Sequence, residues 1–176
     1  MIVCLIDSME DTTLLRQVYE GLDNIKLLVN PSSDKLHQVL LDNPTETLLD
    51  MGHGTGWGLL NANLSGYVLN GFDADELLHN RQVIGIWCHA SDYAESYNVH
   101  GFFTSMFISN ESEANYYNYN SHTNEDIFNE VTLFSKRVNK LLKDKTPLNE
   151  WVEHLRSQAD YSKDYVAFNY NGLRYY

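Results

Sequence analysis

The stretch TLLDMGHGTGWG, from Thr47 to Gly58, joins an apolar run to an unusual glycine-rich ending. The apolar half, which closes with Asp50, is typical of a parallel β-strand covered on both faces. The other half sets His53 between two glycines and adds two further glycines before the stretch ends. A strand that only turns does not need this composition. The stretch therefore indicates a buried strand whose carboxyl end carries a functional loop.

Short apolar runs alternate with amphipathic segments on both sides of this stretch. Strands are expected in the runs MIVCLID, IKLLVN, TLLDMG, QVIGIWC and GFFTSMFIS, at 1–7, 25–30, 47–52, 82–88 and 101–109. Helices are expected over 8–22, 33–43, 73–79, 123–142 and 146–157. This order predicts an α/β fold, a three-layer sandwich with a mainly parallel central sheet and helices on both faces.

Local signals mark where several of the helices begin and end. Ser8 is a cap at the start of the first helix, and Pro44 stops the second. Asp73 is expected to open the short third helix as part of a capping box. Thr146 as cap and Pro147 at the first helical position are expected to start the last helix.

Three further segments have a simpler signature. The run 58–70 has two apolar segments around a polar turn, which predicts a small hairpin between the third and fourth strands. The tyrosine- and asparagine-rich run 115–120 predicts a surface loop. The end of the chain, 165–176, is expected to form one or two short strands about Asn171-Gly172.

Composition and charge limit the class of protein. The chain has 176 residues, 43% hydrophobic and 20% charged, which fits one globular domain with a sizeable core. The formal net charge of −12 argues against nucleic acid or an anionic membrane as partner. Two cysteines, Cys4 and Cys88, are too few for a disulfide framework, so we expect a reducing, cytoplasmic setting.

Parallel sheets of this kind carry their chemistry at the carboxyl ends of the strands. The candidate functional residues are therefore those that directly follow the first, third and fourth apolar runs. They are Asp7 and Ser8, then residues 50–54, then residues 88–92.

One family that this edge resembles is the receiver domain of two-component systems. The run CLIDSMED puts acids after the first strand, and Asp50 at the end of the third strand would be the phosphoacceptor. Receiver domains carry Ser or Thr after the fourth strand and Lys-Pro after the fifth. Here the fourth strand ends in Trp87-Cys88-His89, and MFISNESEA contains no lysine. A phosphoacceptor domain that uses Asp50 is kept as the more distant alternative.

A closer resemblance is to the caspase-like cysteine peptidases, which include caspases, metacaspases, gingipains, clostripain and separase. In these proteins an apolar strand ends in His-Gly, an insertion follows, and a second apolar strand ends in Cys. Metacaspases carry Gly-His-Gly-Thr, which matches residues 52–55, and place His after the catalytic cysteine, which matches Cys88-His89. The resemblance to this superfamily covers about residues 1–110. The run GFFTSMFISNESEANYYN, 101–118, also resembles the segment that follows the cysteine in bacterial members.

The resemblance implies a caspase-like fold, with sheet order resembling 2-1-3-4-5, the small hairpin between strands three and four, and a helical C-terminal part. It implies one domain, 1–176, in which 1–110 is the catalytic core and 111–176 completes the sandwich. It also implies a cysteine endopeptidase with His53 and Cys88 as the dyad. The backbone N–H groups of Gly54 and Cys88 would form the oxyanion hole, and a thioester would be the intermediate.

The chemistry of these residues agrees with that implication. A cysteine nucleophile needs a nearby imidazole to take its proton or stabilise the thiolate. Glycines on both sides of His53 let the backbone approach a substrate peptide closely. His89 follows Cys88 directly and should point to the opposite side. His53, Cys88 and His89 have no recognised metal-ligand spacing, so we expect neither a metal nor a cofactor.

Substrate recognition departs from the metacaspase pattern. Metacaspases place an aspartate two residues before the cysteine, where this chain has Ile86, so a preference for basic residues does not follow from that position. Trp57, Asp92 and Glu111 are the candidate substrate-binding residues, and Glu95 and Glu113 are further acids on the same side. We expect a peptide or protein substrate and a homodimer or an activating partner. A catalytically inactive binding module of the same fold is the main alternative.

Overall fold

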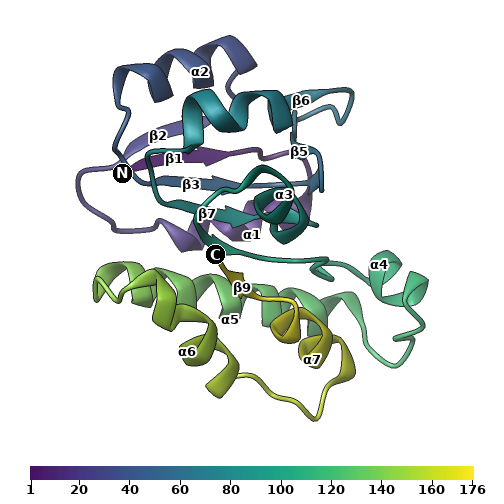
Figure 1. Ribbon diagram of the computed structural model, residues 1–176. Helices are drawn as coiled ribbons and strands as arrows, with labels where there is room; N and C mark the ends of the chain where they lie inside the picture. Colours follow the sequence, from purple (N-terminus) through teal and green to yellow (C-terminus); the bar gives the residue numbers. More distant parts are fainter.

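The computed structural model describes residues 1–176 and is built around a six-stranded mixed sheet (Figure 1). Its strands are β1 (Ile2–Leu5), β2 (Lys26–Val29), β3 (Leu48–Met51), β7 (Val83–Ile86), β8 (Gly101–Phe103) and β9 (Arg174–Tyr175). They follow the order β2-β1-β3-β7-β8-β9. The first five are parallel, and β9 pairs antiparallel with β8. The prediction of an α/β fold with a mainly parallel sheet is confirmed.

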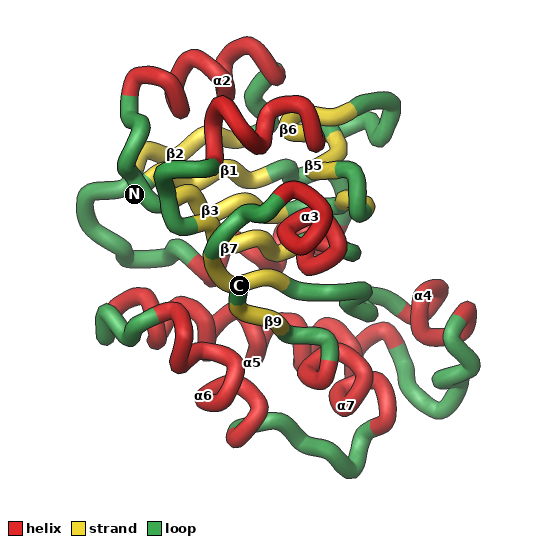
Figure 2. Tube along the Cα trace, viewed as in Figure 1, coloured by secondary structure: helices red, strands yellow, loops and turns green.

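Helices cover the sheet in two layers (Figure 2). One layer contains α2 (Ser33–Asp42), η3 (Ala74–Leu78, a π-helical turn) and α3 (Ala90–Tyr97). The other contains α1 (Glu10–Leu14), η1 (Leu15–Val18), α5 (Asn124–Lys143), α6 (Trp151–Ser157) and α7 (Asp164–Asn171). The short elements η2 (Gly71–Asp73), α4 (Glu111–Tyr116) and η4 (Leu148–Glu150) lie in the connections. None of these helices is long and apolar enough to cross a membrane.

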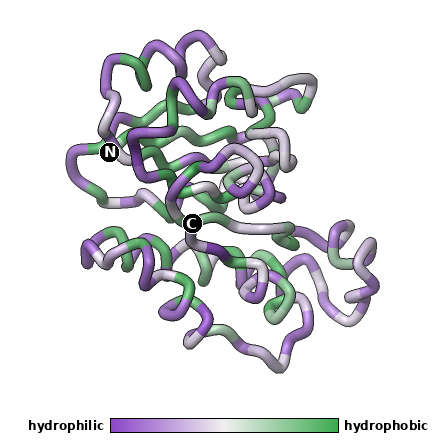
Figure 3. The backbone as a smooth tube through the Cα atoms, viewed as in Figure 1, coloured by the Kyte–Doolittle hydropathy of each residue, from purple (hydrophilic) through white to green (hydrophobic).

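Each face of the sheet has its own apolar core, because successive strand residues point to opposite faces. Val3, Leu49 and Ile84 belong to the cluster beneath α5, whereas Ile2 and Leu48 belong to the cluster beneath α2. The backbone trace is accordingly apolar through the central strands and polar along much of the outside (Figure 3). Strands covered on both faces read as continuous apolar runs, which is why the sequence located them correctly.

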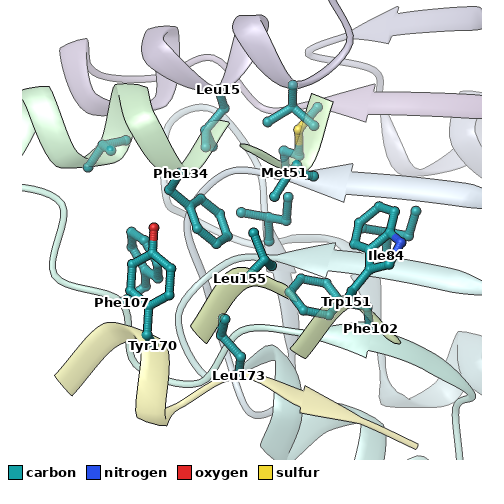
Figure 4. Packing of buried hydrophobic residues seen from close by; sticks show 14 of the residues in the cluster. Leu15, Met51, Ile84, Phe102, Phe107, Phe134, Trp151, Leu155, Tyr170 and Leu173 are labelled. Atoms are coloured by element: carbon teal, nitrogen blue, oxygen red, sulfur yellow. The ribbon is translucent and has the colours of Figure 1, made fainter. Parts of the chain in front are cut away.

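The cluster beneath α5 contains many aromatic side chains (Figure 4). Phe134 of α5 lies between Phe107 and Tyr170, at ring-centroid distances of 4.8 and 5.9 Å. Trp151 of α6 contacts Phe102 of β8 at 5.3 Å. Each of these rings is at least nine-tenths buried, so the C-terminal helices are attached to the sheet mainly by burial of aromatic surface.

A second, small antiparallel sheet follows β3. It contains β4 (Gly54–Thr55), β5 (Gly58–Leu60) and β6 (Tyr67–Asn70). The predicted hairpin is thus present as β5 and β6, and β4 adds a strand that the sequence pattern did not indicate. Gly58 has φ +152°, and a Cβ there would lie 2.1 Å from the Leu69 carbonyl oxygen, so this position requires glycine.

Several local predictions were wrong. The first helix has Met9, not Ser8, as its N-cap, and it gives way to a 3₁₀ turn that ends at Val18. Most of the expected C-terminal strands form helix α7, since a helix buries Tyr165, Val166, Asn169 and Tyr170 together, and only β9 is extended. Aromatic content favoured strands there, and the packing against α5 decided otherwise. Two caps also differ, as Asn70, not Asp73, caps the turn after β6, and Pro147 precedes the first helical residue of η4.

Candidate active site

His53 and Cys88 leave the sheet at equivalent positions. β3 and β7 are parallel neighbours whose last register pair is Met51 with Ile86, and each candidate residue comes two positions after its strand. Gly52 makes the exit of β3 possible, since it has φ +149° and a Cβ would lie 2.8 Å from the Ile6 Cβ. The two residues therefore emerge side by side although they are far apart in the sequence.

Both side chains line one small cavity of about 30 Å³, which is room for about one water molecule. Three chain segments close the cavity around His53 and Cys88. Helix α1 contributes Asp11, the segment after β8 contributes Phe107 and Ser109, and α5 contributes Val131. The expected pair is thus brought together at the carboxyl edge of the sheet, in a narrow and mostly apolar setting.

His53 faces a buried carboxylate from the first turn of α1. The His53 Nε2 lies 3.5 Å from an Asp11 oxygen, and the two side chains are 17% and 4% exposed. At this distance Nε2 has no well-aligned hydrogen-bond partner. The contact is electrostatic, and it becomes an ion pair when His53 is protonated. The Asp11 carboxylate raises the pKa of His53 above its ordinary value, against the opposing effect of burial.

Asp11 is held by several donors. Burial alone would raise the pKa of Asp11, but contact with His53 and a hydrogen bond from Ser109 outweigh it and lower that pKa to about 2. The Ser109 hydroxyl lies 2.7 Å from Asp11 and 3.0 Å from Glu113, between the two carboxylates. Burial raises the pKa of Glu113. Asp11 is therefore an ionised, fixed partner for His53.

Replacing Asp11 by asparagine is expected to lower the pKa of His53, because the raising charge is removed while burial remains. If His53 acts as a base, the acid limb of the pH–rate profile moves to lower pH. The pair stabilises the fold fully between the ordinary pKa values of Asp and His, 3.8 and 6.5. The stabilisation is lost as pH falls to about 2, and as pH rises from 6.5 through the raised pKa of His53. NMR titration of the His53 ring measures the shift. Asp92→Asn, beside His89, is the control and should leave His53 unchanged.

Cys88 is half-buried, and its thiol is protonated in this state. Burial raises the pKa of its thiol to about 12. Its Sγ lies 3.6 Å from the Phe107 carbonyl oxygen, to which the thiol donates, and no hydrogen bond joins it to His53. A standing thiolate–imidazolium pair is therefore absent from this conformation.

His89 and the candidate substrate-binding residues lie outside the cavity. His89 has φ +67° and pairs with Asp92 at 2.7 Å, outside the cavity, as the alternation of side chains predicted. The three candidate substrate-binding residues, Trp57, Asp92 and Glu111, do not line the cavity either. Trp57 is 42% exposed and packs against two other aromatic rings at the surface, while Glu111 is exposed at the start of α4.

Gly54 packs directly against Trp87, the residue that precedes Cys88. A Cβ at Gly54 would lie 2.0 Å from Trp87 Cδ1 and 2.7 Å from the Gly58 carbonyl oxygen. The Trp87 indole N–H donates to the Thr55 carbonyl at 3.3 Å, which ties the loop after His53 to the end of β7. These contacts hold the backbone at Gly54 against Trp87, and Gly54 itself does not line the cavity.

The substitution Gly54→Ala is expected to lower the free energy of unfolding by about 1–3 kcal/mol, the usual range for overpacking a dense site. Thermal unfolding measures the loss. Gly66→Ala is the matched control, because the nearest atom to a Cβ there is the end of the Asn61 side chain at 3.4 Å. Equal stability of the two variants would contradict the packing described for Gly54.

Asp50 lies inside the fold and not at its edge. It belongs to β3, is fully buried, and neither carboxyl oxygen has a hydrogen-bond partner. Burial raises its pKa to about 8. A phosphoacceptor must meet phosphate at the surface, so the buried position of Asp50 gives the receiver interpretation no support.

No protein-family model matches the chain, and no curated protein is similar enough to count as a relative. The function therefore has to be inferred from the motif around His53 and Cys88 and from the geometry of their cavity.

Proposed function

We propose that this protein is a caspase-like cysteine endopeptidase with His53 and Cys88 as its catalytic dyad. One observation carries the proposal: the two residues follow neighbouring parallel strands at matched positions and line the same cavity. A histidine between glycines or a cysteine after a strand is common when it stands alone. Their juxtaposition at the edge where α/β sheets carry chemistry supports catalysis.

The arrangement of elements supports the caspase-like assignment. The five parallel strands follow the order expected from the resemblance, and the small sheet β4–β6 lies in the chain between the two strands that carry the dyad. Helices α4 to α7 make up most of residues 111–176, as expected for a segment that completes the sandwich.

Catalysis would begin with attack of the Cys88 Sγ on the carbonyl carbon of a peptide bond. The new S–C bond forms as the carbonyl π electrons move to oxygen, and His53 takes the thiol proton. Asp11 stabilises the imidazolium that results, which compensates for the absence of a preformed thiolate. Backbone N–H groups of Gly54 and Cys88 would hold the oxyanion.

Collapse of this intermediate re-forms the carbonyl and breaks the C–N bond. The leaving amine takes the proton from His53, and the acyl group remains on Cys88 as a thioester. Water then attacks the thioester with His53 as base, and the thiol regains its proton as it leaves. Every proton is accounted for by His53 and water, so the steps call for no cofactor.

The substrate would be an exposed peptide segment of another protein. Ile86, two residues before Cys88, presents an apolar wall to the cavity, and Asp11 is already paired with His53. Trp57, Asp92 and Glu111 would contact substrate residues away from the scissile bond. The narrow cavity, and a thiol that is bonded to Phe107, suit a protein that becomes active when a partner, or a second copy, opens the site.

A catalytically inactive binding module is the second candidate. It is favoured by the raised pKa of Cys88 and by the hydrogen bond of its thiol to Phe107 instead of His53. Catalytic contacts are often long in unliganded enzymes and tighten only with substrate, so the peptidase remains our first proposal.

Incubation of the protein with a peptide library derived from a bacterial proteome tests the proposal. New termini identified by mass spectrometry should share a residue preference next to the cut. The same library treated with Cys88→Ala should show none of these termini. If the wild-type protein cuts nothing, or Cys88→Ala cuts as well, the endopeptidase proposal is wrong.

A further inference from the structure

The segment Thr104–Asn110, between β8 and α4, contacts both halves of the site. Its Phe107 carbonyl accepts the hydrogen bond from the Cys88 thiol. Its Ser109 hydroxyl lies 2.7 Å from the Asp11 carboxylate, which faces His53. The position of this segment therefore governs both the thiol and the carboxylate that partners the histidine.

One side chain from the C-terminal helix holds the middle of this segment. Asn169 of α7 accepts from the Ile108 backbone N–H at 2.7 Å and donates to the Ile108 carbonyl at 2.9 Å. Asn169 is 1% exposed. Ile108 stands between the two residues that touch the site, and a two-point contact with its peptide groups fixes both the place and the orientation of the backbone.

Helix α7 is itself anchored. The Tyr170 hydroxyl lies 3.0 Å from the buried Glu130 carboxylate of α5, which also pairs with Arg137 at 2.8 Å. A second tie joins α7 to the start of the segment, where the Ser105 N–H donates to the Gly172 carbonyl at 3.1 Å. These contacts fix the position of α7, and therefore the position of Asn169.

The segment has no other regular structure to fix it, since residues 104–110 belong to no helix or strand. A buried asparagine is costly unless its polar groups are satisfied, and here the Ile108 backbone supplies the partners. An apolar residue at 169 would leave both peptide groups of Ile108 without these partners. Asn169 thus pairs with the backbone N–H and C=O groups of this segment, as a neighbouring strand pairs with those of a β-strand.

We infer that Asn169 is a positioning residue of the active site, which keeps the segment Thr104–Asn110 closed over Cys88 and aligned with Asp11. It touches neither substrate nor dyad and acts through Ile108. The effect on hydrolysis rests on the proposed function, whereas the effect on access to Cys88 does not.

Alkylation by iodoacetamide tests the inference, with the two cysteines of the chain read separately by mass spectrometry. Cys4 lies in β1 and is fully buried, so its labelling reports global unfolding. In Asn169→Ala, Cys88 should be labelled about tenfold faster or more, since two ordinary hydrogen bonds are lost, while Cys4 stays unlabelled. Peptide hydrolysis should change in the opposite direction, with kcat lowered about tenfold and KM changed less.

Asn171→Ala is the matched control, since this residue is exposed on the same helix and should behave as wild type. Asn169→Asp retains the acceptor for the Ile108 N–H but loses the donor. It takes the place of Asn169→Ala in the labelling experiment if the alanine variant does not fold. Labelling of Cys88 at the wild-type rate, or only in parallel with Cys4, would overturn the inference, as would faster labelling with unchanged kcat. If even the wild-type protein hydrolyses no peptide, the proposed function fails and the labelling ratio alone still decides the role of Asn169.

Discussion

Replacement of Cys88 by alanine abolishes peptide hydrolysis, and His53→Ala slows it by about 10²–10⁴-fold, if the two residues form the dyad. The first variant removes the atom that forms the thioester. The second removes the only imidazole that lines the cavity, and with a thiol pKa of about 12 very little thiolate exists without it. Initial rates on one fluorogenic peptide, chosen from the cuts found in the library, measure both effects.

His89→Ala is the control for this pair. His89 is adjacent to Cys88 in the chain but lies outside the cavity and pairs with Asp92. Its removal should change the rate by less than about threefold, within the scatter of surface substitutions. A large loss of rate in His89→Ala together with a small loss in His53→Ala would show that His89, and not His53, is the base.

Asp50→Asn is expected to give the largest gain in stability of any single substitution considered. The folded state holds the pKa of Asp50 at about 8 because of burial, whereas the unfolded chain has the ordinary value of 3.8. Between these two values the folded state binds a proton that the unfolded state has released, so stability falls as pH rises from about 4 to about 8. At about 1.4 kcal/mol per pKa unit, the loss at pH 8 is on the order of 5 kcal/mol.

Urea unfolding at pH 4.5 and pH 8 measures this dependence. The asparagine resembles the protonated carboxyl and does not titrate, so the two proteins should be similarly stable near pH 4.5 and differ most near pH 8. Asp42→Asn, an exposed position at the end of α2, is the control and should leave the pH dependence as it is. An Asp50→Asn variant that is the less stable protein at both pH values would contradict the burial of an unpaired carboxyl.

Much of the fold follows from patterns that are local in sequence. Apolar runs bounded by turn residues located β1, β3, β7 and β8, because strands buried on both faces are continuously apolar. The edge strand β2 is apolar in sequence as well, although most of it is exposed. The helix α7 was predicted as strand, since its aromatic residues favour a sheet by composition and only the surface of α5 decides that they pack from a helix. Tertiary packing overrode propensity there.

Some residues of the candidate site could be predicted from the sequence, and others could not. His53 and Cys88 could be recognised because each stands at the end of a predicted strand. Asp11 could not, since its helix-start pattern hides a contact with Ser109 that spans 98 positions. Asn169 and Ile108 are 61 positions apart, and nothing near either residue in the sequence indicates the other. Residues that position a site through long-range hydrogen bonds become visible only when the chain is folded.

The central claim is that Cys88 is a nucleophile that His53 activates, and covalent trapping tests it most directly. Peptidyl chloromethyl ketones of basic, acidic and apolar type are incubated with the folded protein, and the adducts are mapped by mass spectrometry. The account predicts one adduct on Cys88, none on the buried Cys4, and loss of the adduct in His53→Ala. A Cys88 that stays unmodified by every reagent while the protein is folded, or that reacts equally well without His53, would contradict it.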